Sequence, residues 1–551
     1  MKEKIVIYQI FTRLYGNRNT TRKEGGTIEE NGCGKLNDFT PSTLKKIREM
    51  GVSHIWYTGV IRHASQTDYS AFGIPCQHPA VVKGRAGSPY AITDYYDIDP
   101  DLAADVDKRM QEFEQLVERT HKAGMKVIID FVPNHVARQY HSICKPEGVK
   151  DLGEDDNPQH GFDPQNNFYY CPGERFAPYF DLYHGQEQPY IEEPAKATGN
   201  DCFHNAPGMN DWYETVKLNY GVDYYAGRVG HFNPIPDTWS KMTDILLFWA
   251  KKGVDGFRCD MAEMVPAEFW RWTTDKVKFI CPGIVFIGEV YNPAEYRNYL
   301  GAGFDYLYDK VGMYDTLREV ICGNQTTHAI TSAWQQTDDI RDHMLYFLEN
   351  HDEQRIASSF FAGDGRKGVP GFVVSALLQQ NPLMVYAGQE YGEKGMDKEG
   401  FSGHDGRTTI FDYWNIDTLT RAAQRKLTKD EKALKAMYDK ILTIARTEKA
   451  VANGVCFDLM YVNDQYQHQY AFIRKCGGEA LLVVANFAGV PTTMDVTIPA
   501  HAFDYLKLKE RRNVTAVDLL TGKEIKRQLS RDCYVSVDLE PCSAVVLKFN
   551  A

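Results

Sequence analysis

Three acidic residues, Asp260, Glu289 and Asp352, each follow a short apolar run of the kind that forms a buried strand. Arg258 precedes Asp260 by two residues, so on a strand both side chains would project to the same side. There the guanidinium would keep the Asp260 carboxylate ionised. A nucleophilic carboxylate and a carboxylic acid about 5 Å apart across an anomeric carbon are what retaining cleavage of a glycosidic bond requires. These residue types therefore suit covalent and acid–base chemistry on a sugar.

Each of these residues also has a plainer interpretation. An Asp at a strand end is more often a helix N-cap or a turn residue. The spacing of Arg258 and Asp260 alone would fit a structural ion pair, and Asn350-His351-Asp352 alone would more often be a turn. The chemistry is therefore supported only if the elements of the chain bring these side chains to one place.

One unit recurs along the chain: an amphipathic helix, a glycine, a short apolar strand and a polar tip. The helical segment 108–123 leads in this way to Asp130, and the segment 241–252 leads to Asp260. A third unit leads to Glu289. Helices of period 3.6 that alternate with continuously apolar strands predict a parallel sheet buried on both faces.

Eight such strands can be counted, and they predict an α/β fold built on a closed (β/α)8 TIM barrel. A doubly wound sheet fits less well, because no glycine-rich phosphate loop follows the first strand. Barrel enzymes place their chemistry at the carboxyl ends of the strands, where these acidic residues fall. The predicted strands are Ile5–Phe11, Val52–Tyr57, Val127–Asp130, Val254–Asp260, Ile284–Ile287, Phe304–Leu307, Met344–Leu348 and Leu383–Tyr386.

Two parts of the chain depart from this repeat. Residues 137–219 are rich in Pro, Gly, Asn, Asp and aromatic residues without a sustained period, which predicts an inserted subdomain after the third strand that forms one wall of a cleft. Short alternating strands predict a C-terminal antiparallel β-sandwich over residues 450–551. The catalytic barrel is therefore expected over residues 1–136 and 220–449.

Composition narrows the classes of function. A net charge of −12 over 551 residues, with no Lys/Arg cluster, argues against a nucleic-acid partner. The sequence contains no apolar run of about 18 residues, so it predicts no membrane span. The twelve cysteines include no CxxC pair, which disfavours zinc. Scattered cysteines without a signal-like start predict a cytoplasmic protein, although a trimmed exported chain would look the same. The oligomeric state stays open.

Four segments, in order along the predicted barrel, resemble the signature sequences of the α-amylase family, glycoside hydrolase family thirteen. They are Asp130-Phe-Val-Pro-Asn134-His135, Gly256-Phe-Arg258-Cys-Asp260, Gly288-Glu289-Val290 and Asn350-His351-Asp352. The runs 7–11, 90–96 and 386–390 are similar to further barrel segments of that family. The resemblance therefore extends from the first predicted strand to the eighth.

The resemblance implies a role for each matching residue. Asp260 would be the nucleophile, Glu289 the acid/base that protonates the leaving oxygen, and Asp352 the carboxylate that binds ring hydroxyls. Asp130 and Asn134 would support the site rather than react. The substrate-binding residues would be Tyr90, which stacks beneath the sugar, His135 and His351, which hydrogen-bond it, and Arg258.

Two departures from the family pattern bear on specificity and on metal binding. After Asp260 the chain continues Met261-Ala-Glu-Met264, where many members carry Lys-His on the leaving-group side, so the acceptor preference stays open. The same resemblance implies a calcium site that draws on Asn134, an Asp of the insertion and a carbonyl near position 264. Lys217 stands where calcium-dependent members often have Asp, and an ammonium cannot ligate calcium. We therefore predict no required cofactor and no metal ligands, with a structural calcium as the alternative.

The sequence thus predicts a retaining glycoside hydrolase that cleaves α-1,4-glucosidic bonds of maltooligosaccharides and other α-glucans through a covalent intermediate. A transglycosidase or isomerase of the same family, of the 4-α-glucanotransferase type, would share that intermediate and differ in whether water or a sugar intercepts it. A non-catalytic sugar-binding barrel is the third hypothesis, and the presence of all three carboxylates opposes it. Fold alone does not decide among the three.

Overall fold

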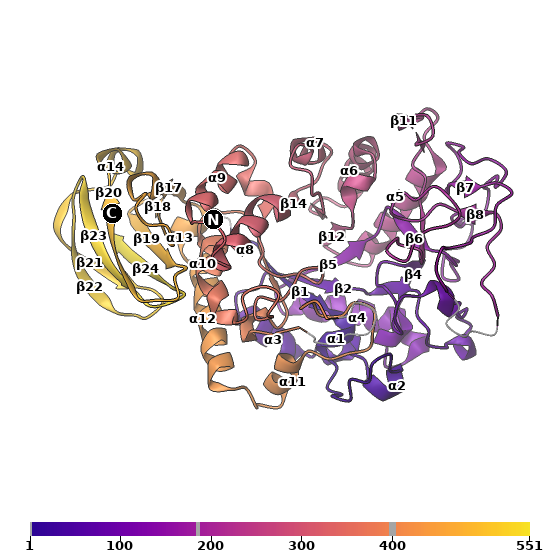
Figure 1. Ribbon diagram of the computed structural model, residues 1–551, viewed down its shortest axis with the longest axis horizontal. Helices are drawn as coiled ribbons and strands as arrows, with labels where there is room; N and C mark the ends of the chain where they lie inside the picture. Colours follow the sequence, from indigo (N-terminus) through magenta and orange to yellow (C-terminus); the bar gives the residue numbers. More distant parts are fainter. Residues whose placement is uncertain (1–2, 183–187, 396–403, 551) are drawn as a thin grey trace.

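The centre of the molecule is a closed barrel of eight parallel strands (Figure 1). The computed structural model describes residues 3–182, 188–395 and 404–550. Strands pair in the order β15-β14-β13-β12-β5-β2-β1-β16, and a bridge between Tyr346 and Leu383 closes the ring. The predicted TIM barrel is therefore confirmed. The strands are β1 (Val6–Phe11), β2 (His54–Thr58), β5 (Lys126–Phe131), β12 (Gly256–Cys259), β13 (Val285–Gly288), β14 (Tyr306–Tyr308), β15 (Met344–Leu345) and β16 (Leu383–Tyr386).

The strand β15 is shorter than the apolar run predicted for it. Only Met344 and Leu345 belong to the strand, because the next residue, Tyr346, forms its bridge to β16 instead. Side chains from seven of the strands, together with Tyr314 and Phe347, fill the barrel as a buried cluster of their own. They support the carboxyl-end face from below. The cluster comprises Ile7, Trp56, Ile128, Ile287, Tyr308, Tyr314, Leu345, Phe347 and Met384.

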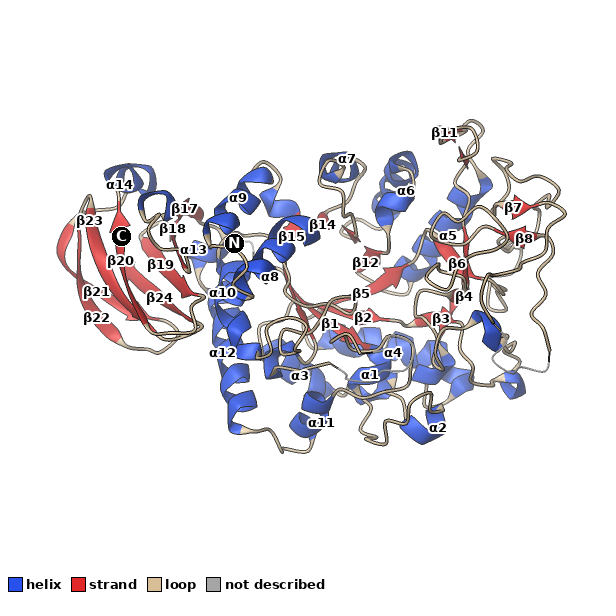
Figure 2. Cartoon of the chain, in the orientation of Figure 1, coloured by secondary structure: helices blue, strands red, loops and turns tan. Residues whose placement is uncertain are grey.

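Helices cover the outside of the barrel (Figure 2). Their apolar faces pack on the strands, and glycines in the left-handed region end two of the longest, Gly124 (φ 76°) after α4 and Gly253 (φ 90°) after α5. No helix in the described ranges is long and apolar enough to cross a membrane. The helices of the barrel are α1 (Thr12–Tyr15), α2 (Ile28–Asn31), α3 (Pro41–Glu49), α4 (Arg109–Lys122), α5 (Asp237–Lys251), α6 (Ala267–Ile280), α7 (Tyr296–Gly301), α8 (Asp315–Ile321), α9 (His328–Gln336), α10 (Val369–Leu377), α11 (Asp417–Ala423) and α12 (Lys429–Thr447).

Between β5 and α5 the chain forms small antiparallel pairs outside the barrel, at the right of Figure 1. The pair nearest the barrel sets His135 opposite Lys217, so both ends of the insertion return to the carboxyl-end face. A similar pair, β3 (Ile61–His63) with β4 (Ile92–Ile98), follows β2. The pairs between β5 and α5 are β6 (His135–Ala137) with β9 (Thr215–Lys217), β7 (Tyr170–Cys171) with β8 (Ala195–Lys196), and, beyond residue 219, β10 (Val222–Asp223) with β11 (Val229–Gly230).

The C-terminal part, at the left of Figure 1, contains a six-stranded antiparallel sheet and a two-stranded one. Buried Arg474 on β18 donates to the Leu378 carbonyl oxygen, next to α10 of the barrel, and also to the Ala450 carbonyl oxygen within the C-terminal part, so it connects this part to the barrel. The elements are α13 (Lys449–Ala452), β17 (Val455–Asp458), β18 (Gln469–Cys476), β19 (Glu479–Asn486), β20 (Thr492–Ile498), α14 (Ala500–Leu506), β21 (Arg511–Asp518), β22 (Glu524–Leu529), β23 (Cys533–Leu539) and β24 (Ser543–Asn550).

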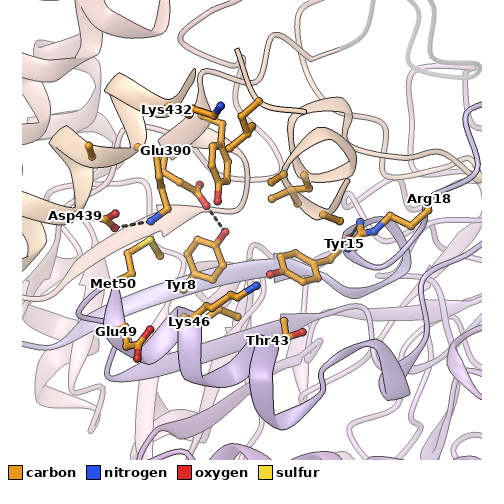
Figure 3. Close-up of a pocket in the computed structure, with 18 residues that line it drawn as sticks. Tyr8, Tyr15, Arg18, Thr43, Lys46, Glu49, Met50, Glu390, Lys432 and Asp439 are labelled. Carbon is orange, nitrogen blue, oxygen red and sulfur yellow. Dashed lines mark hydrogen bonds and ion pairs between the residues drawn. The ribbon is translucent and has the colours of Figure 1, made fainter. Parts of the chain in front are cut away.

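A hollow of about 590 Å³ lies on the outer side of the barrel wall, lined by α3, α11 and α12 (Figure 3). Tyr8 of β1 reaches it, and the Tyr8 hydroxyl donates to Glu390 Oε1 at 2.7 Å. Because Tyr8 faces the helices while its neighbour Ile7 faces the barrel interior, this hollow is separate from the carboxyl-end face.

Candidate active site

Asp260 and Glu289 lie side by side because their strands are neighbours. β12 and β13 pair in register, with Cys259 opposite Gly288. The ladder continues one residue further, where the Glu289 N–H donates to the Cys259 carbonyl at 3.1 Å and the Asp260 N–H donates to the Phe131 carbonyl at 2.9 Å. Both carboxylates therefore lie at the carboxyl end of the barrel strands, and both are buried.

A single guanidinium joins the two carboxylates. Arg258 Nη1 lies 2.7 Å from Asp260 Oδ1, and Nη2 lies 2.8 Å from Glu289 Oε2. Nη1 is also 3.7 Å from Asp130 Oδ1. Arg258 is only 1% exposed. One cation thus faces three carboxylates where little water screens them, so its interactions are stronger than at a surface.

Aromatic rings enclose Arg258. Its guanidinium carbon lies 5.2 Å from the Trp56 ring and 5.5 Å from the Tyr90 ring. It lies 5.4 Å from the Tyr308 ring, and its Nε donates to the Tyr308 hydroxyl at 3.2 Å. Trp56 Nε1 donates to Asp130 Oδ2 at 3.0 Å. These cation–π contacts and hydrogen bonds fix the plane of the guanidinium, and so they fix the directions in which its Nη1 and Nη2 groups point.

Burial controls the protonation of these carboxyls. It raises the pKa of Asp260 well above its usual range, while Arg258 opposes the rise and the Glu289 carboxylate adds to it. Burial also raises the pKa of Asp130 to about 6 against the pull of Arg258. A site of this kind holds one proton to a higher pH than an isolated carboxyl would.

Two donors that the sequence did not single out orient Glu289. The Met261 N–H donates to Glu289 Oε2 at 2.8 Å, and the Tyr291 hydroxyl donates to Oε1 at 2.5 Å. Met261 has a φ of 42°, a left-handed conformation that costs energy for a residue with a side chain. That conformation accompanies the turn of its N–H towards Glu289. The spacing of Tyr291, two residues after Glu289, could have identified it, whereas the backbone of Met261 has no sequence signal.

Asp352 approaches the same pocket from the loop after β15. Its Oδ2 lies 3.1 Å from His351 Nε2. Gln9 Nε2 donates to His351 Nδ1 at 2.7 Å, so Nε2 carries the ring proton. The Tyr90 hydroxyl is 2.5 Å from the same Nε2. Burial lowers the pKa of His351 well below its usual range, so the ring is neutral.

His135 lies on the insertion side of the pocket, with its ring centroid 5.2 Å from that of Trp212. Burial lowers the pKa of His135 to about 3, and the positive charges of Lys217 and Lys83 add to this effect. A neutral imidazole can both donate to and accept from a hydroxyl group.

The structure brings six of the seven predicted site residues to one pocket of about 280 Å³, and the seventh, Arg258, lies behind it. Two aperiodic segments, the insertion and the loop after β16, supply most of the other lining residues, which is why periodicity could not reveal them. The remaining lining residues are Lys83, Ser88, Trp212, Glu214, Thr215, Met261, Tyr291, Arg407, Thr408, Ile410 and Phe411.

Among the residues that the structure describes, one group of three potential metal ligands comes together, Asp94, Asp97 and Cys144. Arg62 lies 2.9 Å from Asp94 and 3.2 Å from Asp97. Arg109 lies 2.7 Å from Asp97. Because two arginines already neutralise the carboxylates, this group does not fit a metal ion.

Known proteins are similar to this chain in sequence and in structure. The family model of the α-amylase catalytic domain matches residues 9–450. Alpha-amylase 3 of Dictyoglomus thermophilum is 24% identical over 77% of this chain and 79% of its own length. Cyclomaltodextrin glucanotransferase of Geobacillus stearothermophilus is 22% identical over 87% of this chain and 59% of its own. The crystal structure of a maltogenic alpha-amylase from Thermotoga neapolitana matches with a TM-score of 0.65 at 18% identity over 99% of both chains, which shows a shared fold.

Replacing Arg258 by Met is expected to lower the free energy of unfolding by about 3–5 kcal/mol near pH 8, because three buried carboxylates lose their cation. Without Arg258 the folded-state pKa values of Asp130 and Asp260 lie further above their unfolded values, because Arg258 opposes the rise that burial causes. As the pH falls, these carboxyls become protonated and the variant recovers stability relative to the wild type. The difference between the two free energies of unfolding should therefore be smaller at about pH 5 than near pH 8. Denaturant unfolding at both pH values measures this.

The double variant Arg258→Met/Asp260→Asn is the control. It removes one of the carboxylates that Arg258→Met leaves without a cation, so it should recover part of the lost free energy of unfolding. An equal deficit at both pH values would contradict the assignment of Arg258 as the cation that compensates these carboxylates.

Proposed function

Because this chain belongs to the α-amylase family, we propose that it hydrolyses α-1,4-glucosidic bonds of maltooligosaccharides with retention, through a covalent glycosyl-enzyme intermediate. The observation that carries the proposal is the contact of one guanidinium, that of Arg258, with both Asp260 and Glu289. Because both carboxylates contact the same guanidinium, they lie together at one position in the pocket, which supports a pair acting on a single glycosidic bond.

In this proposal Asp260 attacks the anomeric carbon from the β face and Glu289 gives its proton to the leaving glycosidic oxygen. Arg258 stabilises the Asp260 carboxylate, which leaves Glu289 as the group that would exchange the proton with the glycosidic oxygen. Glu289 then takes a proton from water, the water oxygen attacks the anomeric carbon, and the bond to Asp260 breaks. Two inversions leave the product in the α configuration.

The other residues of the pocket would hold the sugar. Neutral His135 can exchange hydrogen bonds with ring hydroxyls, His351 can donate through its Nε2–H, and the Asp352 carboxylate accepts from them. The Tyr90 ring offers a stacking surface. The pocket has a volume of only about 280 Å³, and the buried pair Lys83–Glu214 (3.0 Å) lies in its wall. These features support short maltodextrins, rather than granular starch, as substrates.

A cytoplasmic location is part of the same proposal. All twelve cysteines lie within the described ranges, and each is a free thiol. Free thiols suit a reducing compartment.

A transglycosidase is the second candidate. The side chains of Met261 and Tyr291 line the pocket beside Glu289, and they present apolar surface to whatever attacks the intermediate. Such a surface can hold an acceptor sugar and displace water. The relative from Geobacillus stearothermophilus carries the name of a glucanotransferase.

Azide and α-maltosyl fluoride are expected to distinguish the two central carboxylates. Asp260→Ala should lower kcat on the order of 10⁴-fold, and azide can then attack the fluoride only from the β face, giving β-maltosyl azide. Glu289→Ala should still form the intermediate, because fluoride leaves without a proton. Azide needs no base, so it should restore turnover and give α-maltosyl azide.

The anomer is read by NMR. Asp352→Ala is the control: azide should not restore its turnover, and neither α- nor β-maltosyl azide should form. The α-azide from Asp260→Ala, or the β-azide from Glu289→Ala, would reverse the two assignments.

The products formed from maltoheptaose distinguish a hydrolase from a transferase. Hydrolysis should give only sugars shorter than the substrate, because water alone intercepts the intermediate. Chromatography over the first tenth or so of the reaction checks this. A ladder that extends above maltoheptaose would favour the transglycosidase, and unchanged substrate would favour a binding protein.

A further inference from the structure

A buried lysine of the insertion lies among oxygen atoms from three segments of the chain. Lys217, on β9, is 2% exposed. Its Nζ lies 2.5 Å from Asn134 Oδ1 and 2.6 Å from Asp201 Oδ1. It lies 3.4 Å from the Met264 carbonyl oxygen. Asn134 follows β5, Asp201 belongs to the insertion, and Met264 lies in the loop after β12, so one ammonium joins all three.

We propose that the Lys217 ammonium is a permanent, protein-borne cation that takes the place of a structural metal ion at this junction. In consequence, the insertion and the barrel hold together, and the pocket keeps its shape, without calcium.

The chemistry of the three oxygen atoms is what a calcium ion would use: a side-chain amide, a carboxylate and a backbone carbonyl. Calcium needs about six to eight oxygen ligands at about 2.3–2.6 Å. At 2.5 Å from Asn134 Oδ1, however, Lys217 Nζ fills the position that the ion would need. An ammonium has three hydrogens, and three acceptors surround this one. The residues present therefore fit an ammonium and do not fit calcium.

The surroundings of Lys217 are built to hold a charge. Asp201 has a φ of 63°, a left-handed conformation that Asp tolerates better than most residues, and its carboxylate meets the ammonium. Arg228 Nη2 lies 3.8 Å from the other oxygen of Asp201. The Tyr224 ring centroid lies 5.5 Å from Lys217 Nζ. Burial lowers the pKa of Lys217, and the Asp201 carboxylate opposes that shift.

Lys217 is a positioning residue for the pocket on two sides. It pairs with His135 in the β6–β9 ladder and holds the side chain of Asn134, the residue before His135. Its contact with the Met264 carbonyl reaches the segment after β12 in which Met261 donates its N–H to Glu289. A change at Lys217 should therefore disturb both walls around the reacting sugar.

The first test uses the unaltered protein. Thermal unfolding after dialysis against EDTA, and again with millimolar calcium, should give the same Tm within about 1 °C, because the cation is part of the chain. A fall of several degrees in EDTA that calcium reverses would overturn the proposal.

The second test moves the charge. Lys217→Met should lower Tm by several degrees with or without calcium. Lys217→Asp replaces the ammonium by a carboxylate beside Asn134, Asp201 and the Met264 carbonyl, so it should be destabilised in EDTA and recover Tm on addition of calcium. If Lys217→Asp does not fold, Lys217→Asn serves in its place. Lys217→Met as stable as the wild type, or a folded Lys217→Asp indifferent to calcium, would contradict the proposal.

Lys4→Asp is the matched control. Lys4 is also 2% exposed, and its Nζ donates at 2.7 Å to a backbone group, the Gln379 carbonyl oxygen, whereas Lys217 contacts a carboxylate and a side-chain amide. Lys4→Asp should lose stability that calcium does not restore. Calcium rescue of Lys4→Asp equal to that of Lys217→Asp would mean that the response is not specific to the junction.

Activity is the second readout, since a purely structural lysine would not make turnover depend on calcium. With maltoheptaose, kcat of Lys217→Asp should rise at least about tenfold on adding calcium, with a smaller change in KM. This arm rests on the proposed function, whereas the Tm measurement does not. Calcium rescue of Tm without any turnover would count against the function only, and loss of both rescues would count against the role of Lys217.

Discussion

The contact between Arg258 and three buried carboxylates is the interaction on which the site depends. Placing Asp130, Asp260 and Glu289 together away from water would be strongly unfavourable without a cation among them. The barrel makes the arrangement possible: alternation along β12 places residues 258 and 260 on one side, and the neighbouring β13 brings in Glu289. The inward-facing rings of Trp56 and Tyr308, from β2 and β14, hold the guanidinium in plane.

The same principle recurs where the insertion meets the barrel. Lys217 supplies a buried positive charge among Asn134, Asp201 and the Met264 carbonyl, as Arg258 does among the carboxylates. Both cations belong to the chain and both contact the segments after β5 and β12 or their strand ends. Buried ion pairs and hydrogen bonds of Arg258 and Lys217 therefore connect both walls of the pocket to the barrel. These contacts explain how an insertion whose sequence has no regular period takes a defined position.

The barrel, and the meeting of six candidate residues in one pocket with Arg258 behind it, could be predicted because the chain carries local signals for them. Apolar runs of four to six residues mark the strands, and Asp260 and Glu289 stand at their ends within recognisable sequences. The left-handed backbone of Met261 could not be predicted, because it arises from tertiary packing. Trp212 and Arg407 come from aperiodic segments whose position only the folded chain defines. Lys217 carried a signal, as a departure from the family pattern, and the resemblance implied an Asp of the insertion and a carbonyl near position 264 beside it. Only the structure identifies that Asp as Asp201 and that carbonyl as the one of Met264.

The central claim is that Asp260 forms a covalent bond to the sugar while Glu289 acts as the general acid and then as the general base. Intact mass spectrometry of Glu289→Ala incubated with α-maltosyl fluoride tests it most directly, because the first step proceeds without an acid and the second lacks its base. The account predicts a mass increase of one maltosyl unit, located on the peptide that contains Asp260. A label on the peptide that contains Asp352, or no label while fluoride is released, would contradict it.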